Sequence, residues 1–156
     1  MIDYRVEVRG VSEQIRKLEN YDAIARREEV PAMDRSVRLI VGDARSNAPR
    51  GPSGNLASSG EADVRPITGY VVGKVEFTDY KALWAEFGTD PHWPPPEKLA
   101  QSMGVEIWEA HLIARKIAVS GTPASHFLWR AYKDNAGTVR RLFEIAVDRI
   151  TRALVV

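Results

Sequence analysis

The chain has 156 residues, 44% of them hydrophobic and 28% charged, which fits one globular domain with a single core. Lys and Arg number 22 against 21 Asp and Glu, so a net charge of +1 gives no general attraction to nucleic acid or to an anionic membrane. The absence of Cys excludes disulfides and thiolate metal sites, and no apolar run approaches the roughly 20 residues that a membrane span needs, so we expect a soluble, unsecreted protein.

The N-terminal region predicts a strand followed by a long, broken helix. Apolar and charged residues alternate over residues 2–9, the pattern of a half-buried strand, which ends at Gly10. Ser12 can cap a helix, and Pro31 should break it near Val30 and begin a second helix. Leu39 projects from the polar side of that helix, whereas its inward positions are Met33, Val37, Ile40, Val41, Ala44 and Ala48.

The next region predicts a loop and a β-hairpin. Residues 49–60 contain two Pro, three Gly and three Ser, which favours a flexible surface loop. We expect it to dock a partner through Arg50, Gly51, Gly54, Asn55 and Leu56. Strands over residues 62–65 and 70–78 are joined by a turn at residues 66–69, and a short helix from Tyr80 ends at Gly88.

The C-terminal half is predicted to be helical. Residues 90–120 form a helical insertion, with a brief helix over 97–103 and a longer one over 106–119. The longer helix carries one apolar stripe at Ile107, Ala110, Ala114 and Ala118 and a second at Trp108, Leu112 and Val119, so it should have two neighbours. The last helix is amphipathic, with Ile145 on its polar face and inward positions at Val139, Leu142, Phe143, Ala146, Val147, Ile150, Ala153 and Leu154.

These elements predict one α+β domain over residues 1–156. A small antiparallel sheet is packed by the long broken N-terminal helix, the middle helix and the C-terminal amphipathic helix. Its aromatic residues exceed what the core needs, and about half of them should pack beneath loops. Trp and Phe are favoured at interfaces, and further apolar residues lie outside the predicted core faces. The candidate oligomer or partner interface therefore comprises Leu39, Trp84, Phe87, Trp93, Trp108, Leu112, Phe127 and Ile145.

Catalytic and metal-binding patterns are weak. His92, His111 and His126 lie 19 and 15 positions apart, without the spacing of a zinc site, and His111 on an inner stripe is better read as a core residue. No nucleophile motif or phosphate-binding loop is present. We therefore expect no enzyme activity, no catalytic residues, no metal and no cofactor.

Two alternatives stay open. Asp63, Asp79 and Lys81 match the D…(D/E)-x-K pattern of metal-dependent nucleases, although an exposed ion pair explains Asp79 and Lys81 equally well. A DNA-binding accessory protein is the other. Arginines gather in a loosely basic N-terminal region, at positions 26, 27, 35, 38, 45 and 50, and along the last helix, at 140, 141, 149 and 152.

Read in order, several short phrases resemble one family, the tail-completion or head-tail joining proteins of long-tailed bacteriophages. The chain has an opening VEVRG, a helix ending in ARSNAP, and a G-x-L-x-x-S segment at Gly54, Leu56 and Ser59. An E-F-G-T phrase over residues 86–89 follows Tyr80 at a slightly longer spacing than is usual in the family. A P-A-x-x-F-L phrase over residues 123–128 precedes the amphipathic helix, and IARKIAVSG resembles a helix of longer members.

The resemblance implies a structural virion protein at the neck or tail, present in the host cytoplasm during assembly. It implies a ring of identical subunits, expected to be a hexamer, that docks the tail to the head connector or adaptor proteins on one side and to tail terminator or tail-tube proteins on the other. Genome DNA would pass through the lumen without sequence-specific binding, and no membrane is involved.

Overall fold

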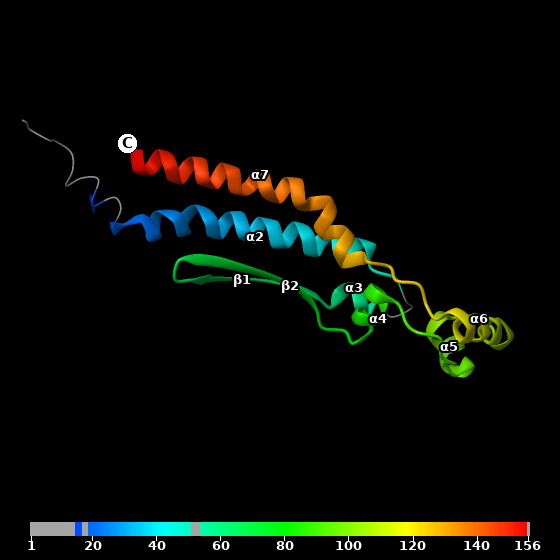
Figure 1. The fold of residues 1–156 in the computed structure, drawn as a ribbon. Helices are drawn as coiled ribbons and strands as arrows, with labels where there is room; N and C mark the ends of the chain where they lie inside the picture. The colour runs from blue at the N-terminus through cyan, green and yellow to red at the C-terminus, as the bar shows by residue number, and fades with distance from the viewer. Residues whose placement is uncertain (1–14, 17–18, 51–53, 156) are drawn as a thin grey trace, which may run out of the picture.

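The computed structural model describes residues 15–16, 19–50 and 54–155. The expected strand over residues 2–9, its end at Gly10, the Ser12 cap and Gly51 of the expected docking loop lie outside this part of the chain. Within it the fold is α+β, as expected: two long helices, α2 (Tyr21–Asn47) and α7 (Phe127–Val155), and a hairpin of β1 (Gly60–Ile67) and β2 (Tyr70–Phe77). Figure 1 shows α2 and α7 lying side by side with opposite chain directions, and the hairpin along the other side of α2.

Helix α2 is continuous, so the predicted break at Pro31 is wrong. A proline inside a helix removes one hydrogen bond and clashes with the preceding turn, at a cost of about 3 kcal/mol. Pro31 lies on the exposed side, whereas Ala25 and Ala32 on either side of it are buried. Packing of this inner face against the rest of the fold therefore holds the helix together across the proline.

The hairpin is longer than predicted. Pro66 and Ile67 belong to β1, where they pair with Val71 and Tyr70, and only two residues form the turn. Gly69 has a φ of 84°, which permits this tight turn. Pro66 is tolerated because a two-stranded sheet has only edge strands, where a missing N–H costs little.

One face of the hairpin packs against α2, and Gly73 sets how closely. In β2 the residues on the face towards α2 are Val71, Gly73, Val75 and Phe77, as the alternation predicts. A Cβ on Gly73 would lie 2.6 Å from Val37 Cγ1 and would also overlap the side chain of Met33. Glycine therefore lets the backbone of β2 approach the helix directly.

Small side chains form the contact between α2 and α7. Most of the buried apolar residues in the described part are alanines, including Ala25, Ala32 and Ala44 on α2 and Ala131 and Ala146 on α7. Asn135, which is 7% exposed, crosses between the helices by donating through Nδ2 to Asp43 Oδ2 at 2.5 Å. Arg149 on α7 pairs with Glu28 on α2 at 3.2 Å.

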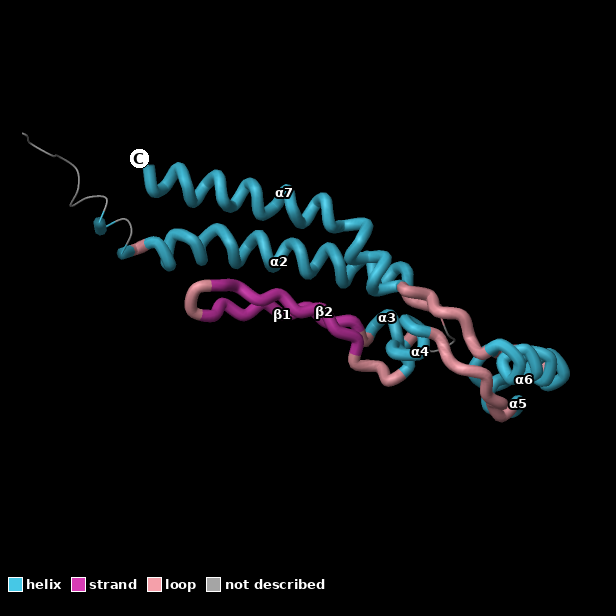
Figure 2. Tube along the Cα trace, in the orientation of Figure 1, coloured by secondary structure: helices cyan, strands magenta, loops and turns pink. Residues whose placement is uncertain are grey.

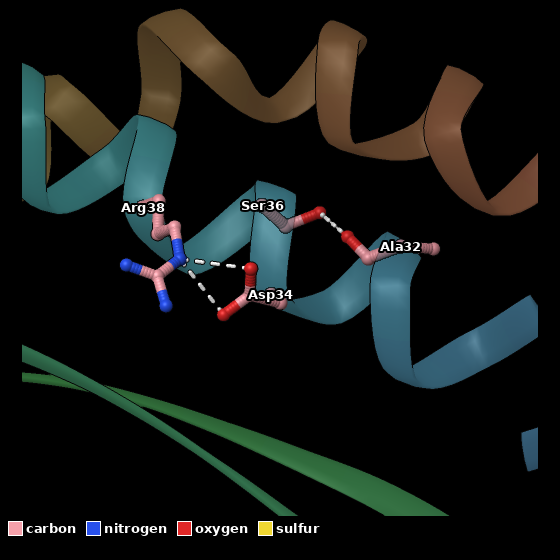
Figure 3. A network of polar contacts seen from close by, with 4 residues as sticks. All are labelled: Ala32, Asp34, Ser36 and Arg38. Atoms are coloured by element: carbon pink, nitrogen blue, oxygen red, sulfur yellow. Dashed lines mark hydrogen bonds and ion pairs between the residues drawn. The ribbon is translucent and has the colours of Figure 1, made fainter.

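Figure 3 shows two of the polar contacts within α2 itself. The buried Ser36 hydroxyl donates to the carbonyl oxygen of Ala32 at 2.7 Å, which satisfies it without a partner from another element. Arg38 donates through Nε to both carboxylate oxygens of Asp34, and this hydrogen bond raises the pKa of Arg38 above its usual value. The pair is exposed, so it contributes little to stability.

The expected loop over residues 49–60 is partly regular in the structure. Residues Asn55–Ser58 form the short helix α3, which Gly54 begins with a φ of 64°, and Gly60 is already the first residue of β1. Leu56 on α3 is buried in the core. The loop prediction failed at these positions because one leucine among small residues was enough to anchor a helical turn.

Residues 90–120 hold α5 (Pro96–Met103) and α6 (Ile107–Ser120), which pack on each other beyond one end of the long helices (Figures 1 and 2). Gly104 ends α5 in the left-handed conformation, with φ 67° and ψ 33°. The backbone N–H of Glu106 donates to the Glu109 carboxylate at 3.1 Å and starts α6.

Candidate functional site

Two Gly-Thr pairs cross where the α5–α6 unit joins the rest of the fold. Thr89 and Thr122 form an isolated antiparallel bridge, with the Thr89 N–H donating to the Thr122 carbonyl oxygen at 3.1 Å. Their hydroxyl oxygens are 2.8 Å apart. Gly88 and Gly121 have φ values of 76° and 69°, and a Cβ on either would overlap the backbone of the opposite segment. We call residues 88–89 and 121–122 the neck.

A buried carboxylate connects the neck to α7. Glu86 lies on α4 (Lys81–Phe87) and is 8% exposed. Its two carboxylate oxygens accept hydrogen bonds from the backbone N–H groups of Leu128 at 2.9 Å and Trp129 at 3.0 Å. These groups lie in the first turn of α7, where N–H donors lack helical partners and negative charge is favourable. Glu86 thus caps α7 from another helix.

The same region holds the hydrophobic cluster of the fold. Phe127 is 1% exposed and meets Phe77 edge to face, with ring centroids 4.9 Å apart. The buried residues around it are Ala44, Ala48, Leu56 and Ala131. Phe127 was expected at an interface but lies in this core, because the cap from Glu86 fixes the start of α7 with that side chain pointing inward.

An apolar groove of about 970 Å³ opens beside this cluster. Its walls come from the end of β2, from α4 and from the first turns of α7. Tyr80, Leu83, Phe87, Trp129 and Tyr132 line it, and each of these side chains is at least half exposed. Among the residues that line it, Asp79 and Glu86 carry negative charge, and none is a Lys or an Arg. We call this surface the α4–α7 groove.

Helix α6 presents a second apolar surface. One predicted stripe is inward in its middle part: Ala110 and Ala114 are fully buried, and α6 packs mainly on α5. Ile107, expected on the same stripe, is 45% exposed at the start of the helix. The second stripe has no cover in the described structure, since Trp108 is 61% exposed, Leu112 59% and Val119 77%. The prediction of a neighbour on each stripe is therefore met on one side only. We call these three residues the α6 stripe.

The expected docking-loop residues lie around a smaller pocket of about 450 Å³. Arg50, Asn55 and Leu56 line it together with Trp84 of α4, whereas Gly54 is exposed nearby. Leu56 belongs to the core as well, so it is not a free docking residue as expected.

The remaining interface candidates are scattered. Leu39 is partly buried on α2, Ile145 is 45% exposed on α7, and Trp93 is 57% exposed beyond the neck. Val147, which was expected to face inward, is 58% exposed. Ala153, also expected to face inward, is exposed as well, and the buried residues of this part of α7 are Ala146 and Ile150.

The structure does not bring the nuclease pattern together. Asp63 pairs with Lys74 in the middle of the hairpin and accepts a hydrogen bond from Arg65. Asp79 lies beyond the end of β2, more than about 10 Å along the strand direction from the Asp63–Lys74 pair. There its carboxylate accepts the backbone N–H of Lys81 at 2.8 Å and helps to begin α4.

Other chemistry is not apparent in the part of the chain that the structure describes. There, no three His, Asp or Glu side chains are grouped to hold a metal, and no helix is both long and apolar enough to cross a membrane. His111 is exposed, not a core residue as expected, because Ala110 and Ala114 occupy the positions against α5.

Of the five large exposed residues that line the α4–α7 groove, the sequence predicted only Phe87 as an interface residue and missed Tyr80, Leu83, Trp129 and Tyr132. The available signal was their helical spacing. Trp129 and Tyr132 stand three positions apart at the start of α7, outside its inward stripe, and their rings lie 5.7 Å apart.

No family model, no curated protein and no solved structure matches this chain.

Proposed function

We propose that this chain is a structural subunit of a tailed bacteriophage, located at the junction of head and tail (the virion neck) or at the tail end. It acts by assembly with copies of itself and with neighbouring virion proteins. The observation that carries the proposal is the distribution of apolar residues. The buried residues are mainly alanines, whereas large side chains such as Leu83, Phe87, Trp108 and Val119 are exposed in the described part. A subunit with this distribution buries its large apolar residues when it assembles.

The positions of the phrases that resemble the tail-completion family support the specific role. Leu56 of G-x-L-x-x-S and Phe127 of P-A-x-x-F-L share one hydrophobic cluster. Glu86 of E-F-G-T caps the helix that begins within P-A-x-x-F-L. Phrases far apart in the chain thus build one junction, which accounts for their occurring together.

The proposed role places the protein in the virion, with the host cytoplasm as its site of assembly. Its partners are further copies in a ring, expected to be a hexamer, with head connector or adaptor proteins on one side and tail terminator or tail-tube proteins on the other. DNA passes through the ring. The near-neutral net charge of +1 suits such passage, because each phosphate contact would add affinity.

Deleting the gene from the phage or prophage that encodes this chain tests the role. The expected result, by electron microscopy, is DNA-filled heads and separate tails, which join when the purified protein is added. Complete particles in the absence of the protein would overturn the proposal.

A second measurement addresses the nuclease alternative. Purified protein is incubated with plasmid DNA and Mg²⁺, alongside the variant Asp79→Asn, which keeps an acceptor for the Lys81 N–H. The proposal expects no cleavage by either protein. Cleavage that the substitution abolishes would favour the nuclease.

A further inference from the structure

We propose that the α6 stripe of one copy seats in the α4–α7 groove of a second copy, so that subunits associate head to tail. This contact deepens the ring assembly proposed above and rests on it. The two surfaces differ: one is a convex helix face, and the other is a groove of about 970 Å³. Contacts between two different surfaces of the same chain repeat, and they produce a closed ring or an open filament.

The neck keeps the stripe away from the groove of its own chain. Figure 1 shows α5 and α6 beyond the end of the long helices, while the groove is formed by α4 and the start of α7. The crossing at Gly88 and Gly121 is too close to admit a side chain, and the bridge between Thr89 and Thr122 fixes it. The two surfaces therefore remain separate within one chain, available to different neighbours.

Charge complementarity favours a second copy as the occupant. Of the two carboxylates that line the groove, Glu86 is buried and already accepts the N–H groups of Leu128 and Trp129. The partly exposed Asp79 is therefore the carboxylate available to a cation from another copy.

Arg115 lies within the α6 stripe at helical spacing, seven residues after Trp108, and the exposed Lys116 flanks it. Lys81, two residues after Asp79, lines the smaller pocket, and its Nζ lies 5.6 Å from the ring centroid of Tyr80, which lines the groove. An apolar helix face with two cations thus meets an apolar groove that offers the partly exposed Asp79 carboxylate.

The dimensions are also compatible. From Trp108 to Val119 the stripe extends about 17 Å along α6. The three stripe residues and five large groove residues are each at least half exposed. At roughly 100 Å² each they offer about 800 Å² of apolar area, which a polar rim extends towards the roughly 1,200 Å² of a specific interface.

The test uses one variant on each surface. Leu112→Asp disables the stripe and Phe87→Asp disables the groove; both positions are exposed, so the fold should survive, which circular dichroism checks. Val147→Asp, on an exposed part of α7 away from both surfaces, is the matched control. Each protein is followed by sedimentation velocity over a concentration series.

The expected result has three parts. Wild type and Val147→Asp self-associate; each surface variant alone associates at least about tenfold more weakly; and an equimolar mixture of the two surface variants forms a dimer that grows no further. The dimer forms because each variant keeps one intact surface, and it stops because no complementary pair remains. Asp79→Asn, which keeps its acceptor oxygen, should weaken association and its salt dependence.

Three outcomes would overturn the contact: a monomeric wild type at all concentrations, no dimer in the mixture, or equal loss with Val147→Asp. Failure of the contact and failure of the proposed function are distinguishable. If the surface variants still join heads to tails, the contact is wrong and the role stands. If the mixture dimerises as expected but particles form without the protein, the contact stands and the role is wrong.

Discussion

Glu86 and Leu128, 42 positions apart in the chain, are joined by a hydrogen bond of 2.9 Å from the Leu128 N–H to the Glu86 carboxylate. Together with the bond from Trp129, it places a buried acidic side chain at the start of the longest helix of the described structure. The junction of α4, the neck and α7 depends on this contact, since the groove walls come from the two helices that it connects.

Glu86→Ala should destabilise the protein by roughly 1–3 kcal/mol, because two N–H groups at the start of α7 lose their acceptor in a buried place. Glu86→Gln should lower the free energy of unfolding by less, since its amide oxygen can still accept one hydrogen bond. Urea unfolding measures both. Glu61→Ala, at an exposed position, is the control and should change stability by less than about 0.5 kcal/mol. Equal stability of Glu86→Ala and wild type would contradict the capping role.

Gly73→Ala should destabilise the protein by about 1–3 kcal/mol, because the new methyl group overlaps the side chains of Met33 and Val37. Combining it with Met33→Ala should recover part of the loss. Gly42→Ala is the matched control: it lies within α2 with open space around it, so it should stabilise by roughly 0.5–1 kcal/mol. If both glycine substitutions acted in the same direction, the close packing of β2 on α2 would be disproved.

Gly121→Ala should open the neck, since its Cβ would overlap the carbonyl group of Thr89 and its φ of 69° is unfavourable for alanine. Limited proteolysis should then cleave near the neck several-fold faster than in wild type. Gly104→Ala isolates the backbone effect, because its φ is 67° but nothing lies within 4 Å. We expect Gly104→Ala to lower the free energy of unfolding by about 1 kcal/mol and to cause no new cleavage at the neck. Identical behaviour of the two variants would refute the crossing.

Asn135→Ala should cost roughly 1–3 kcal/mol, because it removes the bond to Asp43 and leaves a partly buried carboxylate without that donor. Arg149→Ala removes another polar contact between the same two helices, but the Arg149 side chain is 62% exposed. Its effect should therefore stay below about 0.5 kcal/mol. Thermal unfolding compares the two, and a larger loss with Arg149→Ala would reverse the ranking derived from burial.

The sequence predicted most of the elements in their correct order. The hairpin turn was predicted to end at Gly69 and the helix from Tyr80 to end at Gly88, and both glycines have a positive φ in the structure. The predictions failed where packing outweighed a local preference. Pro31 did not interrupt α2, and Leu56 drew a predicted loop into the core. Local rules do not contain these contacts, which come from α7 and from residues far along the chain.

The site was predicted less completely than the fold. The α6 stripe followed from helical periodicity alone, because Trp108, Leu112 and Val119 lie on the face opposite the one that packs on α5. The groove did not, since its walls come from α4 and α7, and nothing in the order of residues states that Glu86 caps α7. Phe127 was misassigned for the same reason.

The sequence by itself determined the approximate positions of most helices and strands in the described part of the chain, because these depend on spacing along a backbone of fixed geometry. The tertiary structure alone decided which apolar residues are covered and which stay exposed. That outcome depends on long-range contacts, such as Glu86 with the start of α7 and Gly73 with α2, that bring together segments distant in the chain.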